Sequence, residues 1–470
     1  MRYNNTSGST GEMFRYYKNC GQQPIYLYKK DAGAPGTTHH YTRVFLNETA
    51  KANITIGGPS IIPASSTLNM GTNTLVNENA ANLVIEDGGQ LIHHNAGVQA
   101  TMRKKVTAYL TTEGVNNGWY FVASPIAALT SHNLNSGTFD LYKFEQSADK
   151  EWKNYESTTF SITNKEGYLY ANAANKTIEF VGTLNATDGS KTLAYENVRF
   201  AGFNLIGNPF ACNATIGRLF YRMNSTGTEI FLEGETNAII APCEGVFVQA
   251  QGESESVSFS KATSRGGQQR EMLSMTLSQG SSTIDRAIIQ FGKGETLDKF
   301  MLNTSNTKLF IPQNDKEFAA VATQATAGEM PVSFKASKDG KYTISVNTEN
   351  VEANYLHLID NLTGMDTDLL STPSYTFDAK TSDYASRFKL VFGVKNDNEE
   401  MSQASSFAYI SNGEIVISNE GRATLQVIDV LGRIVSSEEI NGEARISTNG
   451  LTAGLYILNL NGNVQKIVVR

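Results

Sequence analysis

Residues 118–127 read GWYFVASPIA, and residues 202–211 repeat the pattern as GFNLIGNPFA. In both, an apolar and aromatic run typical of a strand stops at a proline, which cannot donate to a strand ladder. A Glu-Gly step then opens another such run in each half, EGYLYA at 166–171 and EGVFVQ at 244–249. Glycine at that step predicts a bulge or a close approach of backbone. The repeat therefore predicts one pseudo-symmetric β-sandwich with two related halves over residues 101–262.

Outward from the repeat, the chain continues to read as short strands separated by turn residues. Residues 47–100 carry apolar triplets between Gly and Asn turns, which predict the rungs of a small β-solenoid. Residues 266–394 contain alternating runs that predict a second β-sandwich. A polar, acidic linker is expected at 395–406. Six or seven short strands at 407–470 predict a small C-terminal Ig-like sandwich. The expected fold class is all-β throughout.

Residues 1–46 read as the end of something larger. The runs at 14–18 and 24–29 predict a hairpin about a turn at Cys20 and Gly21, and such a hairpin is marginal unless it joins a sheet. No apolar segment of signal-peptide type opens the sequence. We therefore expect orphan strands of a truncated upstream domain in this segment.

Composition supports a polar, extracellular all-β protein. The 470 residues comprise 39 Lys and Arg against 46 Asp and Glu, a net charge of −7, and only 18% are charged. An acidic chain without a basic domain is a poor partner for nucleic acid or anionic membranes. No run approaches the 18 apolar residues of a membrane span. A coiled coil, a helical bundle and a disordered chain are also excluded.

The last segment is the most recognisable. Residues 427–435 read VIDVLGRIV, residues 451–458 read LTAGLYIL, and residues 466–470 close the chain as KIVVR. Together they resemble the type A C-terminal sorting domain of type IX secretion cargo, a system of Bacteroidota. The residues that carry this sorting-signal motif are Asp429, Gly432, Arg433, Gly454, Tyr456, Lys466, Val468 and Arg470.

The resemblance implies a route and partners. Such cargo crosses the outer membrane through the type IX translocation machinery. A sortase-like protease usually removes the sorting domain, and the body is anchored to surface lipopolysaccharide or released. The expected location is the outer-membrane surface or the extracellular space, with the linker at 395–406 as the plausible cut site. The signal peptide that the route needs is not visible in this sequence.

The residues of the motif also permit a physical reading. Gly432 can adopt a positive φ, and Arg433 can either bridge to Asp429 across the turn or face a receptor. The strand at 466–470 alternates, so its free edge could pair with a partner's sheet, or it could be an ordinary edge strand.

No catalytic constellation stands out, so we expect no enzyme, cofactor or metal site. The adjacent histidine pairs, His39-His40 and His93-His94, suit exposed loops better than one metal. Glu151, Glu156, Glu166 and Glu244 are only nominal glycosidase carboxylates, and calcium ligation by Asp360, Asp366 and Asp368 is not favoured. Cys212 and Cys243 could pair in an oxidising compartment or be buried thiols.

These observations predict a non-catalytic surface or secreted adhesin or spacer. One alternative is the C-terminal part of an enzyme whose catalytic domain lies upstream. Another is a carbohydrate-binding module at 101–262. A coplanar, exposed strip of Trp119, Trp152 and neighbouring tyrosines would support that alternative.

Overall fold

The computed structural model describes residues 2–4, 13–15, 27–30, 41–112, 115–148, 150–234, 238–262, 270–302, 306–395, 407–411, 413–417, 419, 421–430, 432–442 and 444–469. The chain divides into two compact units, Met1–Lys395 and Asn396–Arg470. The all-β prediction is confirmed: besides one 3-10 turn at Ala80–Asn82, the regular elements of the described residues are strands. None of the described residues forms a helix with the length and apolarity needed to span a bilayer.

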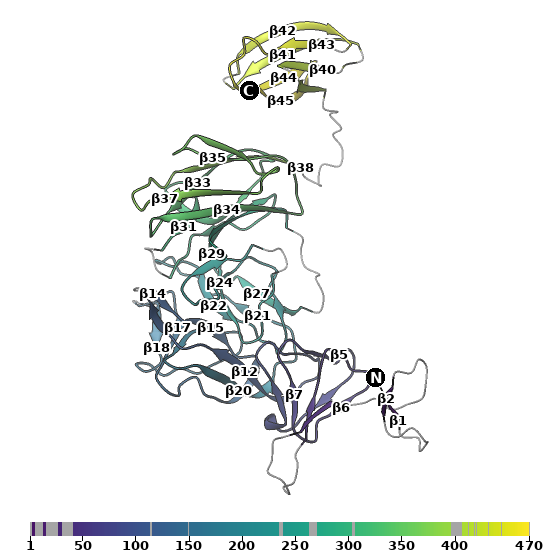
Figure 1. The fold of residues 1–470 in the computed structure, drawn as a ribbon, viewed down its shortest axis with the longest axis vertical. Helices are drawn as coiled ribbons and strands as arrows, with labels where there is room; N and C mark the ends of the chain where they lie inside the picture. Colours follow the sequence, from purple (N-terminus) through teal and green to yellow (C-terminus); the bar gives the residue numbers. More distant parts are fainter. Residues whose placement is uncertain are drawn as a thin grey trace. The chain divides into compact units, whose positions relative to one another are not determined.

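The first part of unit one is a parallel solenoid (Figure 1). Its strands stack in parallel pairs that recur once per turn of the chain. These strands are β4 (Tyr41–Val44), β5 (Glu48–Thr49), β6 (Ile54–Thr55), β7 (Ser60–Ile62), β8 (Thr67–Asn69), β9 (Leu75–Val76), β10 (Leu83–Ile85) and β11 (Gln90–Ile92). Asparagines tie successive turns: Asn53 accepts from the Thr74 N–H at 2.9 Å, and Asn95 accepts from the Leu75 N–H at 3.0 Å.

The solenoid sheet continues past residue 100, where the sequence predicts a boundary. Strand β12 (Gln99–Val106) pairs in parallel with β10 and antiparallel with β20 (Lys176–Leu184), which pairs in turn with β16 (Ile126–His132). One buried cluster runs from Phe45 through the solenoid to Leu184. The solenoid and the first half of the repeat therefore share a core.

The first strands pair differently from the expected hairpin. Strand β2 (Met13–Arg15) pairs with β1 (Arg2–Asn4), and β3 (Leu27–Lys30) pairs with β4. Among the described residues of this segment, 14–15 and 27–29 therefore do not pair with each other as predicted, and the rest of the predicted hairpin lies outside the described residues. Strand β4 has one side free of the solenoid strands, and β3 pairs there as the edge strand of the seven-stranded sheet.

The internal repeat has the same topology twice. The first half orders its four-stranded sheet β15-β19-β17-β18, and the second orders the equivalent strands β22-β26-β24-β25. Three-stranded layers also correspond, β16-β20-β12 with β23-β27-β21. Each half thus carries its own pair of sheets. The strands not yet bounded are β15 (Tyr120–Ala123), β17 (Phe139–Phe144), β18 (Trp152–Asn154), β19 (Gly167–Asn172), β21 (Gly189–Thr192), β22 (Phe203–Gly207), β23 (Ala214–Thr215), β24 (Tyr221–Met223), β25 (Ile230–Leu232), β26 (Gly245–Gln249) and β27 (Ser256–Lys261), beside a small hairpin of β13 (Leu110–Thr112) and β14 (Val115–Asn117).

The two halves meet through reciprocal contacts. Val122 bridges to Glu244, and the equivalent pair with the halves exchanged, Ile206 and Glu166, bridges as well. Such exchange is the signature of a two-fold relation. The predicted close approach occurs here, because a Cβ added to Gly167 would lie 2.7 Å from the Ile206 carbonyl oxygen.

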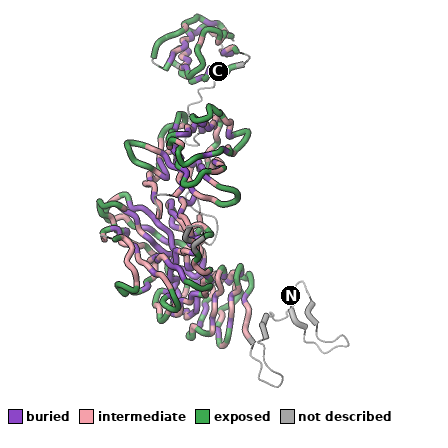
Figure 2. Tube along the Cα trace, turned by 60° about the vertical axis from the view of Figure 1, so that its left-hand side comes forward, coloured by how far each residue is buried: buried purple, intermediate pink, exposed green. Residues whose placement is uncertain are grey.

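Residues 272–395 form a second sandwich, and the sequence predicts one over residues 266–394. Its two layers join through β31, whose first residues pair with β33 and whose last residues pair with β32, a strand that changes sheets. The strands are β28 (Met272–Gln279), β29 (Ser282–Phe291), β30 (Leu297–Asp298), β31 (Lys308–Gln313), β32 (Lys316–Thr323), β33 (Ala327–Lys335), β34 (Gly340–Glu349), β35 (Glu352–Asp360), β36 (Met365–Asp368), β37 (Ser374–Ala379) and β38 (Phe388–Lys395). An aromatic cluster around Phe247 and Phe300 packs this sandwich against the repeat, and buried residues run along the strands (Figure 2).

Unit two is a small two-sheet sandwich. Sheet β39-β40-β43 packs on sheet β42-β41-β44-β45, with Ile415, Leu425 and Leu458 among the residues of their common core. Its strands are β39 (Ala408–Ser411), β40 (Glu414–Ile417), β41 (Arg422–Asp429), β42 (Ile434–Asn441), β43 (Ala444–Ser447), β44 (Gly454–Leu460) and β45 (Asn463–Val469).

Candidate functional site: the C-terminal unit

The turn between β41 and β42 brings three motif residues together. The Arg433 side chain donates from Nε to Asp429 Oδ2 at 2.7 Å, while the Arg433 backbone N–H donates to Asp429 Oδ1 at 2.9 Å. Gly432 has φ of 78°, as expected of glycine at this turn. The pair therefore holds the turn, and the Arg433 side chain, 72% exposed, still faces solvent.

Two further motif residues lie on β44. Tyr456 is buried, and its hydroxyl donates to the Thr452 carbonyl at 3.0 Å. This bond ties the strand to the preceding LTAG turn. Gly454 opens the strand and is exposed. Both positions shape this end of the sheet.

The last strand, β45, is an edge of its sheet. Lys466 and Val468 point outward, whereas the intervening Ile467 is buried. Gln465 hydrogen-bonds both backbone groups of Ala408, which covers part of the strand. Arg470 and residues 396–406 of the predicted linker lie outside the described residues.

Apolar side chains lie exposed on the outer face of the four-stranded sheet, near the turn. Val468 of β45 is 46% exposed and pairs with Leu455 of β44, which is 41% exposed. Ile434, 54% exposed, pairs with Ile428, which pairs with Ile457. These residues, with Arg433 beside them, make up what we call the outer patch. Its exposed apolar surface is of the kind found at protein contacts.

The other candidate residues are engaged in structure. Glu166 pairs with Lys191 at 2.5 Å, and Glu244 pairs with Arg222 at 3.0 Å. The three aspartates diverge: Asp360 pairs with Arg387, Asp366 with His357, and Asp368 binds Ser371. Within the described part of the chain, no group of three or more His, Cys, Asp or Glu side chains could hold a metal.

His93 corrects one expectation. It is 1% exposed rather than a surface loop residue, and burial lowers its pKa to about 4. Its Nδ1 contacts the Asn95 carbonyl oxygen at 3.1 Å. His94, its neighbour, is exposed, since adjacent residues of an extended segment face opposite sides. His39 and His40 lie outside the described residues.

The cysteines and aromatic residues are packing elements. Cys212 and Cys243 are buried free thiols, and burial raises the pKa of each to about 12; Cys20 lies outside the described residues. Trp119 meets Tyr109 at an interplanar angle of 84°, and Trp152 meets Phe144 at 68°. These rings pack edge to face, so they do not form the coplanar strip expected of a sugar platform.

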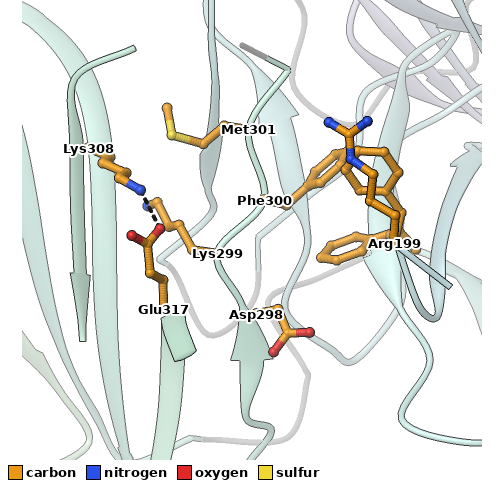
Figure 3. Close-up of a pocket in the computed structure, with 9 residues that line it drawn as sticks. Arg199, Asp298, Lys299, Phe300, Met301, Lys308 and Glu317 are labelled. Carbon is orange, nitrogen blue, oxygen red and sulfur yellow. Dashed lines mark hydrogen bonds and ion pairs between the residues drawn. The ribbon is translucent and has the colours of Figure 1, made fainter. Parts of the chain in front are cut away.

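One cavity of about 190 Å³ lies between the repeat and the second sandwich, below the roughly 300 Å³ of ordinary ligand pockets. Figure 3 shows Phe300 and Arg199 on one side, and Lys299 beside the ion pair of Lys308 and Glu317 on the other. Sequence reasoning singled out none of these residues. One feature of the sequence could have indicated this region. Asp285, the partner of Lys299, is a carboxylic acid residue at a buried position of β29.

Comparison with known proteins now identifies the second unit. The family model of the secretion system C-terminal sorting domain matches residues 411–470. The chain ends in a type IX sorting domain. The predicted resemblance is confirmed, and cargo of this kind is exported to the cell surface or the extracellular space. The sorting domain carries the turn, the edge strand and the outer patch described above.

No curated protein matches the chain. Among solved structures, a chain titled "Biofilm associated protein - BSP domain" aligns with 80% of this chain and 64% of its own length, at 10% identity and a TM-score of 0.12. This chain therefore spans less than two thirds of that one, and a likeness so slight carries no argument.

Proposed function

We propose that the chain is a non-catalytic adhesin or spacer that the type IX machinery delivers to the cell surface. The observation that supports the proposal is the division of the chain into two compact units, one of which is the sorting domain. The sorting domain can serve export while the other unit serves the function at the surface. The sorting domain has a core of its own. A domain with its own core can be recognised and removed without disturbing the body.

The body has the construction of a spacer. The solenoid shares a core with the first half of the repeat, and the repeat shares an aromatic core with the second sandwich. Shared cores resist bending between modules, since flexion would expose packed apolar surface. Such a body would hold a contact surface away from the membrane.

The outer patch is the surface we assign to the secretion machinery. It combines exposed Leu455, Val468 and Ile434 with the solvent-facing guanidinium of Arg433. Arginine is enriched at contact hot spots, and exposed apolar side chains that lie together mark protein contacts. Lipopolysaccharide or surface glycans as anchors belong to the same proposal.

The test is genetic, in a host that exports the chain. Cells carrying the full chain are compared with cells whose chain lacks residues 407–470, and with cells carrying Val468→Asp. Cell fractionation should find the full chain outside and both variants retained in the periplasm. Lys335→Asp, on the second sandwich, is the control and should be exported normally. Export of the deletion variant would overturn the role of the sorting domain.

Adhesion is tested on the same cells. Removing the whole protein should reduce attachment to surfaces and matrix proteins, and the purified surface protein should bind them without turning over glycan or peptide substrates. Unchanged attachment together with hydrolytic activity would favour an enzyme instead.

A further inference from the structure

An amine and a carboxyl are buried together in the second sandwich. Lys299 Nζ lies 2.5 Å from Asp285 Oδ1, and both side chains are only 1% exposed. Asp285 belongs to β29, and Lys299 follows directly after β30. Both segments are fixed on β32: Ile288 and Leu297 pair with Ala320, and the Lys299 N–H donates to the Glu317 carbonyl at 2.8 Å. The contact is therefore built into the sheet.

Backbone groups hold both reacting partners. The Leu309 N–H donates to Asp285 Oδ2 at 2.7 Å, and the Arg286 N–H donates to Oδ1 at 2.8 Å. The amine of Lys299 also contacts the Arg286 carbonyl at 3.3 Å. Oδ2 is thus placed like the oxygen of an oxyanion hole, where a donor stabilises charge that develops during attack on the carbon. The nitrogen is held against Oδ1, one bond away from that carbon, which gives the proximity that amide formation needs.

Burial favours the uncharged forms of both groups. It raises the pKa of Asp285 and lowers the pKa of Lys299, although the attraction between the two groups opposes both shifts. The nearby charge of Lys308 adds to the lowering of the Lys299 pKa (Figure 3). Glu229, close enough to feel the charge of Asp285, has a pKa raised to about 7 by burial. Only the neutral amine is a nucleophile, so this dry environment prepares Lys299 for attack.

A second buried ion pair in the same sandwich shows the contrast. Arg387 binds Asp360 through two bonds of 3.0 and 2.8 Å, again with both side chains 1% exposed. Asp360 also accepts from the Tyr375 hydroxyl at 3.0 Å. A guanidinium does not lose its proton in proteins, so this pair remains ionic. The amine of Lys299 can lose its proton when it is buried, so the pair of Lys299 and Asp285 need not remain ionic.

We propose that Lys299 and Asp285 join in an intramolecular amide bond. The Lys299 nitrogen attacks Asp285 Cγ, the new N–C bond forms, and the bond from Cγ to Oδ1 breaks. Oδ1 leaves as water with the carboxyl proton and one proton of the neutral amine. The second amine proton stays on the amide nitrogen, and Oδ2 remains as the amide oxygen. The ammonium and carboxylate together supply every atom, so no oxidant or further reactant is needed. The product is a neutral amide, so the site no longer holds groups whose charged forms are costly to bury. The amide bond would also link β29 covalently to the segment after β30. Such a link would suit a spacer that bears tension at the cell surface, and this point rests on the proposed function.

Mass spectrometry of the intact full chain tests the proposal. The expected mass is lower than the sequence mass by one water molecule. After tryptic digestion, peptide 271–286 should appear joined to peptide 294–308, because trypsin cannot cleave after an acylated Lys299. The chain offers an internal control in the exposed pair Lys341 and Asp378, 3.0 Å apart and 64% and 81% exposed, whose peptides should appear unlinked.

Two variants separate the bond from mere proximity. Lys299→Met should restore the sequence mass, whereas Asp285→Asn should still cross-link, now with loss of ammonia. The measurement on the unaltered chain is decisive even if a variant fails to fold. Recovery of the sequence mass, with free peptides 271–286 and 294–299, would overturn the proposal.

Discussion

Lys165 and Cys243 occupy the same place in the two halves of the repeat. Each has a positive φ, 68° and 62° respectively, although neither is glycine. The Cys243 carbonyl accepts from the Ala123 N–H at 3.1 Å, and the Lys165 carbonyl accepts from the Gly207 N–H at the same distance. Residues other than glycine adopt such φ values only at a cost in conformational free energy. Because both equivalent positions have this strained backbone, the two halves of the repeat form the interface in the same way.

The centre of this interface has no room for a side chain. A Cβ on Gly207 would lie 2.3 Å from Ala123 Cβ and 2.5 Å from the Glu166 carbonyl oxygen. We expect Gly207→Ala to destabilise the body by about 1–3 kcal/mol, the usual cost of overpacking. Thermal unfolding of the full chain measures it. Gly252→Ala is the control, because no atom lies within 4 Å of that position, and equal melting of the two variants would contradict the interface described.

The turn of the sorting domain predicts unequal effects for its two charges. Asp429→Ala removes an acceptor that is 9% exposed and serves a backbone N–H, so we expect a loss of about 1–3 kcal/mol. Arg433→Ala removes an exposed partner, worth less than about 1 kcal/mol. Hydrogen exchange of β44 in the full chain measures both. A larger loss for Arg433→Ala would show that the ion pair, and not the carboxylate, holds the turn.

His93 should make the solenoid sensitive to acid. Burial lowers its pKa from 6.5 in the unfolded chain to about 4. Between these values the unfolded chain binds the proton and the folded chain does not. Stability is therefore lost as pH falls from 6.5 toward 4, by up to about 3 kcal/mol.

Hydrogen exchange of β10 and β11 at pH 7 and pH 4.5 tests this dependence. His93→Asn, which keeps a donor toward the Asn95 carbonyl, should flatten it. His94→Gln, at the exposed neighbour, should leave it unchanged. An equal response of both variants would assign the acid sensitivity to other groups.

Strands with clear alternation could be predicted from sequence. The alternating runs predicted within 266–394 include residues 287–291, which lie in β29, and residues 356–360, which lie in β35. The repeat in the sequence predicts one sandwich with two related halves, and the two halves have four-stranded sheets of equivalent strand order, since like sequences satisfy the same pairing. Strand partners were harder: β31 pairs with two neighbours, and only the three-dimensional packing decides where it changes sheets.

The sorting domain was predictable because its motif is local, with Asp429, Gly432 and Arg433 within one turn. The pair of Lys299 and Asp285 was not, because its two residues meet only through β32. His93 was misassigned because a pair of histidines gives no sign of which one faces inward. Features set by residues close together in the sequence could be predicted. Contacts that depend on pairing with a third strand could not.

The most direct measurement of the central claim is C-terminal peptide mapping of the protein recovered from the surface of the exporting host. We predict that the mature protein ends between residues 395 and 406, with every peptide of 407–470 absent, because under the proposed function the sorting domain directs export and is then removed. Recovery of peptides that end at Arg470 from the surface protein would contradict this account and make the last sandwich a permanent part of the exported body.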